Sequence, residues 1–147
     1  MHTYQATIRW TCDGDFAKGH YSRAHDWEFD GGAVVRGSAS PLSVPLPFSD
    51  ATALDPEEAF VAAVSSCHML WFLDIAKHAG LEVAGYTDMA KGRMTDGPDP
   101  WIDRVELNPK IIWTGDPPDA ETIQKLHHKA HARCFITNSI KSEVVVN

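Results

Sequence analysis

The chain has 147 residues, of which 44% are hydrophobic and 22% are charged. This size and composition favour one globular domain over residues 1–147 and exclude a disordered chain. Thirteen Lys and Arg residues against twenty Asp and Glu residues give a formal net charge of −7 at pH 7. Because nucleic acids and acidic lipid surfaces carry negative phosphate groups, this charge excludes both as expected partners.

Two further features indicate a soluble, cytoplasmic protein without membrane association. No apolar run reaches the length of a membrane span without polar interruption, and the first residues lack the pattern of a secretory signal. The three cysteines, Cys12, Cys67 and Cys134, fit neither a disulfide scaffold nor a CxxC zinc site, because their number is odd and their spacings are wide. We therefore interpret them as thiols.

The first third of the chain has the pattern of β-strands. Apolar and polar residues alternate over residues 4–10 and again over residues 25–29. Asp30-Gly31-Gly32 then supplies the positive φ of a tight turn, which predicts that residues 33–35 fold back antiparallel. Three prolines within residues 41–49 predict an extended connection, since proline donates no ladder hydrogen bond.

The clearest predicted element is a helix from Pro56 to about Ala79. Asp55 precedes it as an N-cap residue, and Glu58 follows three residues later in capping-box spacing. Gly80 is the expected stop. The first four turns present no wide polar face, so we expect this helix to be surrounded by protein.

The second half of the chain alternates strands with one more helix. Apolar residues follow within 81–86, and those at odd positions over 105–113 predict one half-buried strand. A second helix is expected over 120–134 and a last strand over 142–147. The fold class is therefore α+β with mostly antiparallel sheet. Because one small chain has too little surface to cover so apolar a helix, we expect an obligate homodimer with a shared core.

Two of the cysteines lie on the predicted helices. Cys67 stands near the middle of the first helix, in the polar stretch Ser65-Ser66-Cys67-His68, and Cys134 ends the second. Buried helical cysteines are usually inert small hydrophobes. They form a reversible disulfide instead if the two helices pack against each other. Redox chemistry additionally requires a thiolate, a cation that stabilises it, and a group that orients the cation.

Two alternatives from other functional classes remain open at this point. His127 and His131 share a helical face, and Cys134 follows three residues later, so a zinc site completed by Cys67 is one alternative. A small-molecule-binding module without turnover is the other. His68 is expected to be a packed or hydrogen-bonded histidine rather than a base for Cys67, because helical neighbours point about 100° apart.

The segments DPEEAFVAAVSSCHMLW at 55–71 and HHKAHARCFITNSI at 127–140 resemble the OsmC/Ohr family of thiol-dependent peroxidases. The likeness covers most of the chain, because the strand-rich start, the Pro-Glu-to-Cys helix and the Ala-His-x-x-Cys motif occur in the family's order. The resemblance implies an OsmC-like fold, in which mostly antiparallel sheets wrap around a long buried central helix in an intertwined dimer.

The resemblance also implies roles for individual residues. Cys67 matches the peroxidatic nucleophile of the family, and Cys134 matches its resolving cysteine. Arg23 is the best match to an arginine that favours the thiolate, with Arg36 as the second choice. Glu57 matches the carboxylate that pairs with this arginine and aims it.

The implied activity is that of a peroxiredoxin-like enzyme in oxidative stress defence, which reduces organic hydroperoxides to alcohols. It proceeds through a sulfenic acid on Cys67 and a Cys67–Cys134 disulfide, which an external dithiol of the lipoyl or thioredoxin type reduces. No bound cofactor and no metal are expected. Phe60, Trp71 and Phe72 are expected either to line an apolar substrate pocket or to pack in the core. Cys12 has no counterpart in the family.

Overall fold

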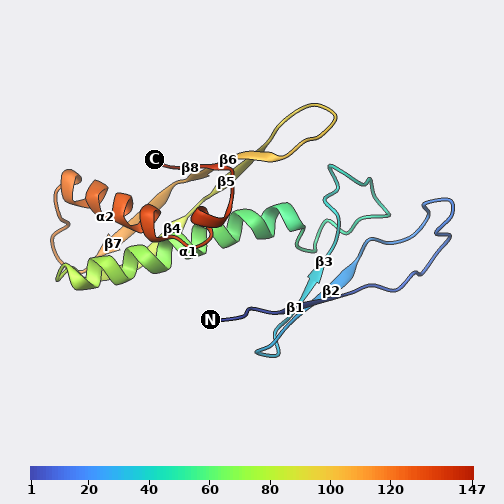
Figure 1. Cartoon of the computed structure of the whole chain (residues 1–147), viewed down its shortest axis with the longest axis horizontal. Helices are drawn as coiled ribbons and strands as arrows, with labels where there is room; N and C mark the ends of the chain where they lie inside the picture. The colour runs from blue at the N-terminus through green and yellow to red at the C-terminus, as the bar shows by residue number, and fades with distance from the viewer. The chain divides into compact units, whose positions relative to one another are not determined.

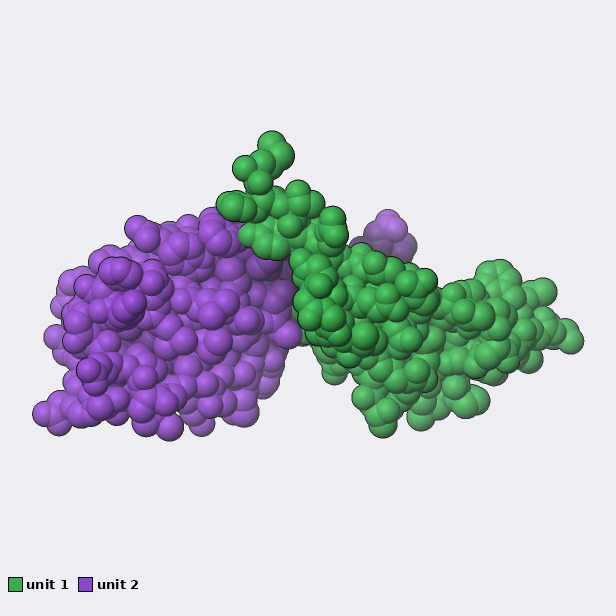
Figure 2. Space-filling model, turned by 90° about the horizontal axis from the view of Figure 1, so that it is seen from below, with its two compact units in different colours: residues 1–59 green, residues 60–147 purple.

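The computed structural model describes all 147 residues and divides into two compact units, Met1–Ala59 and Phe60–Asn147 (Figure 2). Unit 1 holds three strands and the start of a long helix, and unit 2 holds the rest of that helix, five strands, a second helix and a short 3₁₀ helix. The α+β class predicted from the sequence is confirmed. A single domain over residues 1–147 stays a prediction.

Unit 1 contains one antiparallel sheet in the order β1-β2-β3 (Figure 1). The predicted hairpin is confirmed, because the Phe29 N–H donates to the Ala33 carbonyl at 3.0 Å and Gly32 has a φ of +85°. The strands are β1 (Ala6–Arg9), β2 (His25–Phe29) and β3 (Val34–Gly37).

Unit 1 has no apolar core of its own. Its only buried residues are Gly37, Ser38, Ser49 and Asp55, none of which carries an apolar side chain. Strand β1 is exposed along its whole length. Sheets gain their stability chiefly by burying one apolar face. Within the single chain, this sheet leaves such a face exposed to solvent.

Helix α1 (Pro56–His78) begins in unit 1 and continues in unit 2, close to the predicted bounds. The predicted capping box is present: the Glu58 N–H donates to Asp55 Oδ1 at 2.7 Å, and the Asp55 N–H donates to Glu58 Oε2 at 3.2 Å. Gly80, with a φ of +75°, follows its end as predicted. These local signals fix both ends of the helix.

Unit 2 contains two sheets and two helices (Figure 1). Strands β4 and β7 pair antiparallel, and the other sheet has the order β5-β6-β8, in which β6 and β8 run parallel. The prediction of mostly antiparallel sheet therefore holds with one exception. The elements are β4 (Val83–Asp88), β5 (Lys91–Met94), β6 (Ile102–Leu107), β7 (Pro109–Trp113), α2 (Ala120–Arg133), the 3₁₀ helix η1 (Thr137–Ser139) and β8 (Glu143–Val146).

The prediction of one strand over 105–113 is wrong, because the chain breaks at Asn108 into β6 and β7, which belong to different sheets. The Asn108 N–H donates to Asp88 Oδ1 at 2.6 Å, and its side-chain amide donates to the Met89 carbonyl at 3.1 Å. The apolar residues keep their odd positions across the break, so the pattern alone does not reveal it.

The core of unit 2 has two clusters around α1. One consists of Val64, Val105, Leu107 and Val144 and lies between α1 and the β5-β6-β8 sheet. The other lies where α2 packs against α1 (Figure 1). Because Phe72 is fully buried in this second cluster, it is a core residue and not part of an open pocket. The second cluster consists of Phe72, Ala76, Leu126 and Ala130.

Within the single chain, α1 is buried along one stripe only, so the prediction that protein surrounds it is wrong for one copy. The buried residues recur every fourth position, whereas Leu70, on another face, is 60% exposed. The length and composition of α1 would also suit a membrane span, a property shared by core helices of soluble proteins. The buried stripe consists of Val64, His68, Phe72 and Ala76, and the neighbouring exposed face includes Ala62, Ala63, Ser66 and Leu70.

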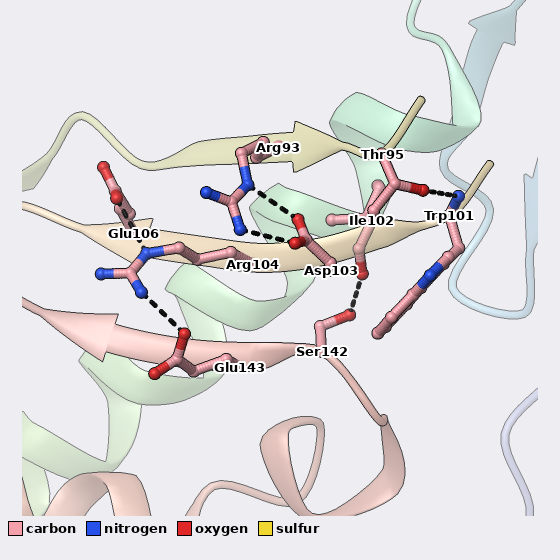
Figure 3. Close-up of polar contacts among 9 residues, drawn as sticks. All are labelled: Arg93, Thr95, Trp101, Ile102, Asp103, Arg104, Glu106, Ser142 and Glu143. Carbon is pink, nitrogen blue, oxygen red and sulfur yellow. Dashed lines mark hydrogen bonds and ion pairs between the residues drawn. The ribbon is translucent and has the colours of Figure 1, made fainter. Parts of the chain in front are cut away.

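Charged side chains tie the strands of the β5-β6-β8 sheet together (Figure 3). Arg93 on β5 makes a two-bond ion pair with Asp103 on β6, and the guanidinium lowers the pKa of that carboxyl. Arg104 on β6 binds Glu106 at 2.9 Å and Glu143 on β8 at 2.7 Å. Because most of these groups are exposed to water, the pairs contribute modestly to stability and mainly keep this surface polar.

Candidate functional site

The structure brings two of the predicted site residues together. Cys67 lies on α1 and Cys134 directly follows α2, and the two thiols lie near enough for Cys134 to raise the pKa of the Cys67 thiol. Both are free thiols, as is Cys12. Cys134 is fully buried, Cys67 is half-buried and Cys12 is exposed. Neighbouring thiols on two packed helices can form a reversible disulfide.

Helix packing accounts for the position of Cys134. Asp119 caps α2, because its Oδ1 accepts the Thr122 N–H at 2.7 Å. Leu126 and Ala130 are buried against α1, and Cys134 continues the same row at four-residue spacing. The apolar residues that pack α2 against α1 therefore also place the Cys134 thiol beside α1.

Burial raises the pKa of the Cys67 thiol above its ordinary value. The backbone N–H of Ile136 acts against this rise, the hydrogen bond with the Cys134 thiol adds to it, and the N–H of Phe135 again lowers the pKa. The net direction is upward. A Cys67 thiolate at neutral pH therefore needs further positive charge beside the sulfur. These two backbone donors were not predicted, since no side-chain pattern marks them.

His68 is fully buried, and its Nε2 lies 3.0 Å from Nδ1 of His127 on α2. Burial lowers the pKa of His68 to about 4, with a smaller contribution from the nearby His127. His68 is therefore neutral at pH 7, and the prediction of a packed, hydrogen-bonded histidine is confirmed. Its partner His127 was not foreseen in this role.

The alternative zinc site is not assembled in the structure. His127 directs Nδ1 toward His68. No group of three or more His, Cys, Asp or Glu side chains is arranged to hold a metal ion. Of the residues of that alternative, His127 is hydrogen-bonded to His68 instead.

Arg23 lies in unit 1, in a pocket of about 400 Å³ whose lining includes Trp10, Phe16 and Tyr21. Its Nη1 donates to the carbonyls of Gly19 at 2.9 Å and Tyr21 at 2.6 Å, and the guanidinium stacks on the Tyr21 ring at 3.7 Å. Trp10 and Phe16 surround the same ring with centroid distances of 5.3 and 5.0 Å. The sequence signal for this pocket is the recurrence of aromatic residues in the first hairpin.

The remaining predicted residues of unit 1 lie on or before α1. Glu57 is half-buried in the first turn of α1, and the ion pairs of the chain include none between it and Arg23. Arg36 pairs with Asp50 at 3.1 Å. Hydrogen bonds from Thr52, and next from Arg36, lower the pKa of Asp50 to about 2. Arg36 is thus engaged by a carboxylate, whereas Arg23 is not.

Comparison with known proteins identifies the family. The profile of OsmC-like proteins matches residues 49–147, and no curated protein matches the chain. An OsmC-like protein of unknown function from Vibrio cholerae is 43% identical, with a TM-score of 0.96 over 100% of this chain and 99% of that chain.

More distant solved structures share the fold. An organic hydroperoxide resistance protein OsmC from Legionella pneumophila has a TM-score of 0.71 at 17% identity, covering 100% of this chain and 98% of that chain. The organic hydroperoxide resistance protein OhrB of Bacillus subtilis has a TM-score of 0.65 at 19% identity, covering 99% and 96%. Together with the match over residues 49–147 and the close Vibrio relative, these comparisons show that the chain belongs to the OsmC-like protein family.

Proposed function

We propose that this protein is a cytoplasmic thiol-dependent peroxidase that reduces organic hydroperoxides to alcohols in oxidative stress defence. The observation that carries the proposal is the proximity of the Cys67 and Cys134 thiols, one on α1 and one directly after α2, in a chain of the OsmC-like family. The names of the Legionella and Bacillus structures support the substrate class.

In the first step, the Cys67 thiolate attacks the terminal oxygen of the hydroperoxide. A sulfur–oxygen bond forms, the oxygen–oxygen bond breaks, and the alkoxide leaves and takes a proton to become the alcohol. The sulfur is oxidised to a sulfenic acid, and the peroxide is reduced.

In the second step, Cys134 attacks the sulfenic acid. A sulfur–sulfur bond forms, the sulfur–oxygen bond breaks, and water leaves with the Cys134 proton. Cys134 is fully buried beside its target, which favours this attack over a second encounter with peroxide. An external dithiol of the lipoyl or thioredoxin type then exchanges with the disulfide and restores both thiols.

Arg23 is proposed to supply the charge that Cys67 lacks, and Glu57 to orient it. Both side-chain hydrogen bonds of Arg23 use Nη1, so the donors on Nε and Nη2 remain for the sulfur and a peroxide oxygen. The aromatic pocket around Arg23 offers an apolar surface, which suits the carbon chain of an organic hydroperoxide.

A homodimer is proposed as the working form. Unit 1 buries no apolar side chain, and α1 leaves the face around Leu70 open. Both surfaces would lose contact with water if a second copy covered them, and each 100 Å² of apolar surface buried contributes roughly 2.5 kcal/mol before association costs.

The test is a count of free thiols before and after one equivalent of cumene hydroperoxide, with the alcohol measured in parallel. Two thiols should disappear and one equivalent of alcohol should form. Cys67→Ser should abolish alcohol formation, whereas Cys12→Ser, a control at the exposed cysteine, should not change it. Peroxide that leaves the thiol count unchanged would identify a binding module without turnover, and full activity of Cys67→Ser would refute the assigned nucleophile.

A further inference from the structure

The hydrogen bond between His68 and His127 determines where both rings carry their protons. It joins Nε2 of His68 to Nδ1 of His127 at 3.0 Å, so one of these nitrogens donates and the other accepts. Nδ1 of His68 is buried and has no hydrogen-bond partner. Because unpaired buried N–H groups are rarer in folded proteins than unpaired buried acceptors, Nδ1 carries no proton. His68 therefore donates from Nε2.

The same hydrogen bond then determines the proton of His127. Burial lowers the pKa of His127 below its ordinary value, so the ring is neutral at pH 7 and holds one proton. Its Nδ1 accepts from His68, which leaves the proton on Nε2. Nε2 has no hydrogen-bond partner in the chain and is open to solvent. The ring face stacks on Phe72 at a centroid distance of 4.4 Å, so His127 presents this N–H from its free edge.

His127 lines a pocket of about 810 Å³ between α2 and β8, in unit 2. One wall is polar, because Gln124 and His131 lie on the same face of α2 as His127. The other wall is apolar and includes Val145 and Val146 of β8. A volume of this size with a few polar groups on a largely apolar lining is typical of small-molecule sites.

The polar groups of this pocket favour an acceptor oxygen over a metal ion. Metal ions bind the unprotonated nitrogen of histidine, whereas Nε2 of His127 carries the proton. Glu121 is the one acidic side chain of the lining, and Lys125 binds its carboxylate at 2.5 Å. A carbonyl or carboxylate oxygen accepts from an imidazole N–H, and the valine wall suits an aliphatic chain.

We propose that the pocket between α2 and β8 binds a small aliphatic acyl compound, whose carbonyl or carboxylate oxygen accepts the Nε2–H of His127. Val145 and Val146 contact its chain. His68 is a positioning residue of this site, because its buried Nδ1 determines which nitrogen of His127 donates. The site includes neither thiol of the Cys67–Cys134 pair and does not rest on the proposed peroxidase activity.

The first measurement is a long-range ¹H–¹⁵N correlation spectrum of the parent protein, labelled with ¹⁵N-histidine, at pH 7.5. The nitrogen shifts show which nitrogen of each ring carries the proton. We expect the proton on Nε2 of both His68 and His127. A proton on Nδ1 of either ring would overturn the proposal, and this measurement needs no variant.

The second measurement is a titration of the labelled protein with octanoate, octanamide and octylamine. All three carry the same chain, but protonated octylamine has no acceptor atom. Octanoate, octanamide or both should shift the Nε2 signal of His127, and the tighter of the two shows whether the ligand is an acid or an amide. Octylamine should bind about tenfold more weakly, because it forms no hydrogen bond with this donor. Equal binding of octylamine, or no binding of either acyl compound, would overturn the proposal.

The variant that isolates the donor is His127→Phe, which keeps an aromatic ring beside Phe72 but has no N–H. It should weaken the tighter acyl ligand by about three- to tenfold, the range expected for one hydrogen bond. The control is His78→Phe, at an exposed histidine near the end of α1 that does not line this pocket, and it should bind like the parent. Parent-like affinity in a folded His127→Phe protein would refute the assigned donor.

Discussion

Nε2 of His68 lies 3.0 Å from Nδ1 of His127, and the two rings stack with a centroid distance of 5.3 Å and an interplanar angle of 10°. The hydrogen bond joins α1 to α2 beside Cys67. Burial lowers the pKa of His68 to about 4, and burial also lowers the pKa of His127. One neutral ring donates and the other accepts, so protonation of the accepting nitrogen removes the hydrogen bond.

Acid should therefore destabilise the protein through this pair. The pKa of His68 is 6.5 in the unfolded chain and about 4 in the folded chain, so the unfolded state binds the proton more readily between these values. The contribution is complete above pH 6.5 and is lost as the pH falls through 4. At about 1.4 kcal/mol per unit, the loss reaches on the order of 3 kcal/mol.

Urea unfolding at pH 7.5 and pH 4.5 measures this loss. The control is His68→Gln, because glutamine does not titrate. The carboxylates lower the stability of both proteins equally in acid, so the difference between the two proteins reports His68. The drop in unfolding free energy should be smaller in His68→Gln than in the parent. Equal drops would show that His68 does not carry the acid sensitivity.

Cys134→Ser should leave Cys67 without its resolving partner. Its sulfenic acid then persists and reacts with a second equivalent of peroxide, which gives a sulfinic acid. Intact mass spectrometry should find two added oxygen atoms after excess hydroperoxide, whereas Cys12→Ser should end as the internal disulfide. A Cys134→Ser protein that stays reduced and active over many turnovers would contradict the resolving role.

Arg23→Ala should slow the alkylation of Cys67 at pH 7 by about tenfold, because loss of a nearby cation raises the pKa of a thiol by about one unit. Arg36→Ala should not, since that guanidinium pairs with Asp50. Arg23→Lys should restore part of the rate, because it keeps the charge but not the planar fork. An effect of Arg36→Ala alone would transfer the assignment to that residue.

Gly92→Ala should weaken the contact between β5 and α1. A Cβ atom at residue 92 would lie 2.6 Å from Cγ2 of Val61, whose side chain is stiff within a helix. Overpacking of this kind costs about 1–3 kcal/mol, measured as a lower urea midpoint. Gly31→Ala is the control, because a Cβ there meets no atom within 4 Å. Equal stability of the two variants would show that α1 shifts freely on the sheet.

Leu70→Arg should weaken the proposed dimer. Leu70 is 60% exposed on α1, and a charge in a shared apolar core without a partner is costly. Sedimentation velocity should find a larger monomer fraction than in the parent protein. The control is Leu42→Arg, at a leucine that is 99% exposed. If Leu70→Arg associates as tightly as the parent, the interface lies elsewhere.

Local chemistry determined which parts of the fold were predictable. Both ends of α1 follow from Asp55, Glu58 and Gly80, whose effects act within a few residues. The break between β6 and β7 depends on Asn108 binding Asp88, a residue twenty positions away, so no local pattern contains it. The parallel pairing of β6 with β8 likewise joins segments that are far apart in the sequence, so local patterns do not predict it.

In the candidate site, too, local features were predictable from the sequence and long-range contacts were not. Helical periodicity placed Cys67 and Cys134 on apolar helices, but only family resemblance paired them before the structure did. The partnership of His68 with His127 depends on how the two helices pack, which no local pattern in the sequence reveals. The roles of Arg23 and Glu57 stay predictions.

The first core cluster joins Val64 on α1, Val105 on β6 and Val144 on β8. Val64 and Val144 come from opposite ends of unit 2, and Val105 comes from its middle, so the cluster forms only after the intervening chain has closed a large loop. Folding of unit 2 should accordingly be limited by topology rather than by helix formation, at the slow end for an α+β domain of its size. In a stopped-flow experiment, helical circular dichroism of α1 would then develop before the β5-β6-β8 sheet is complete.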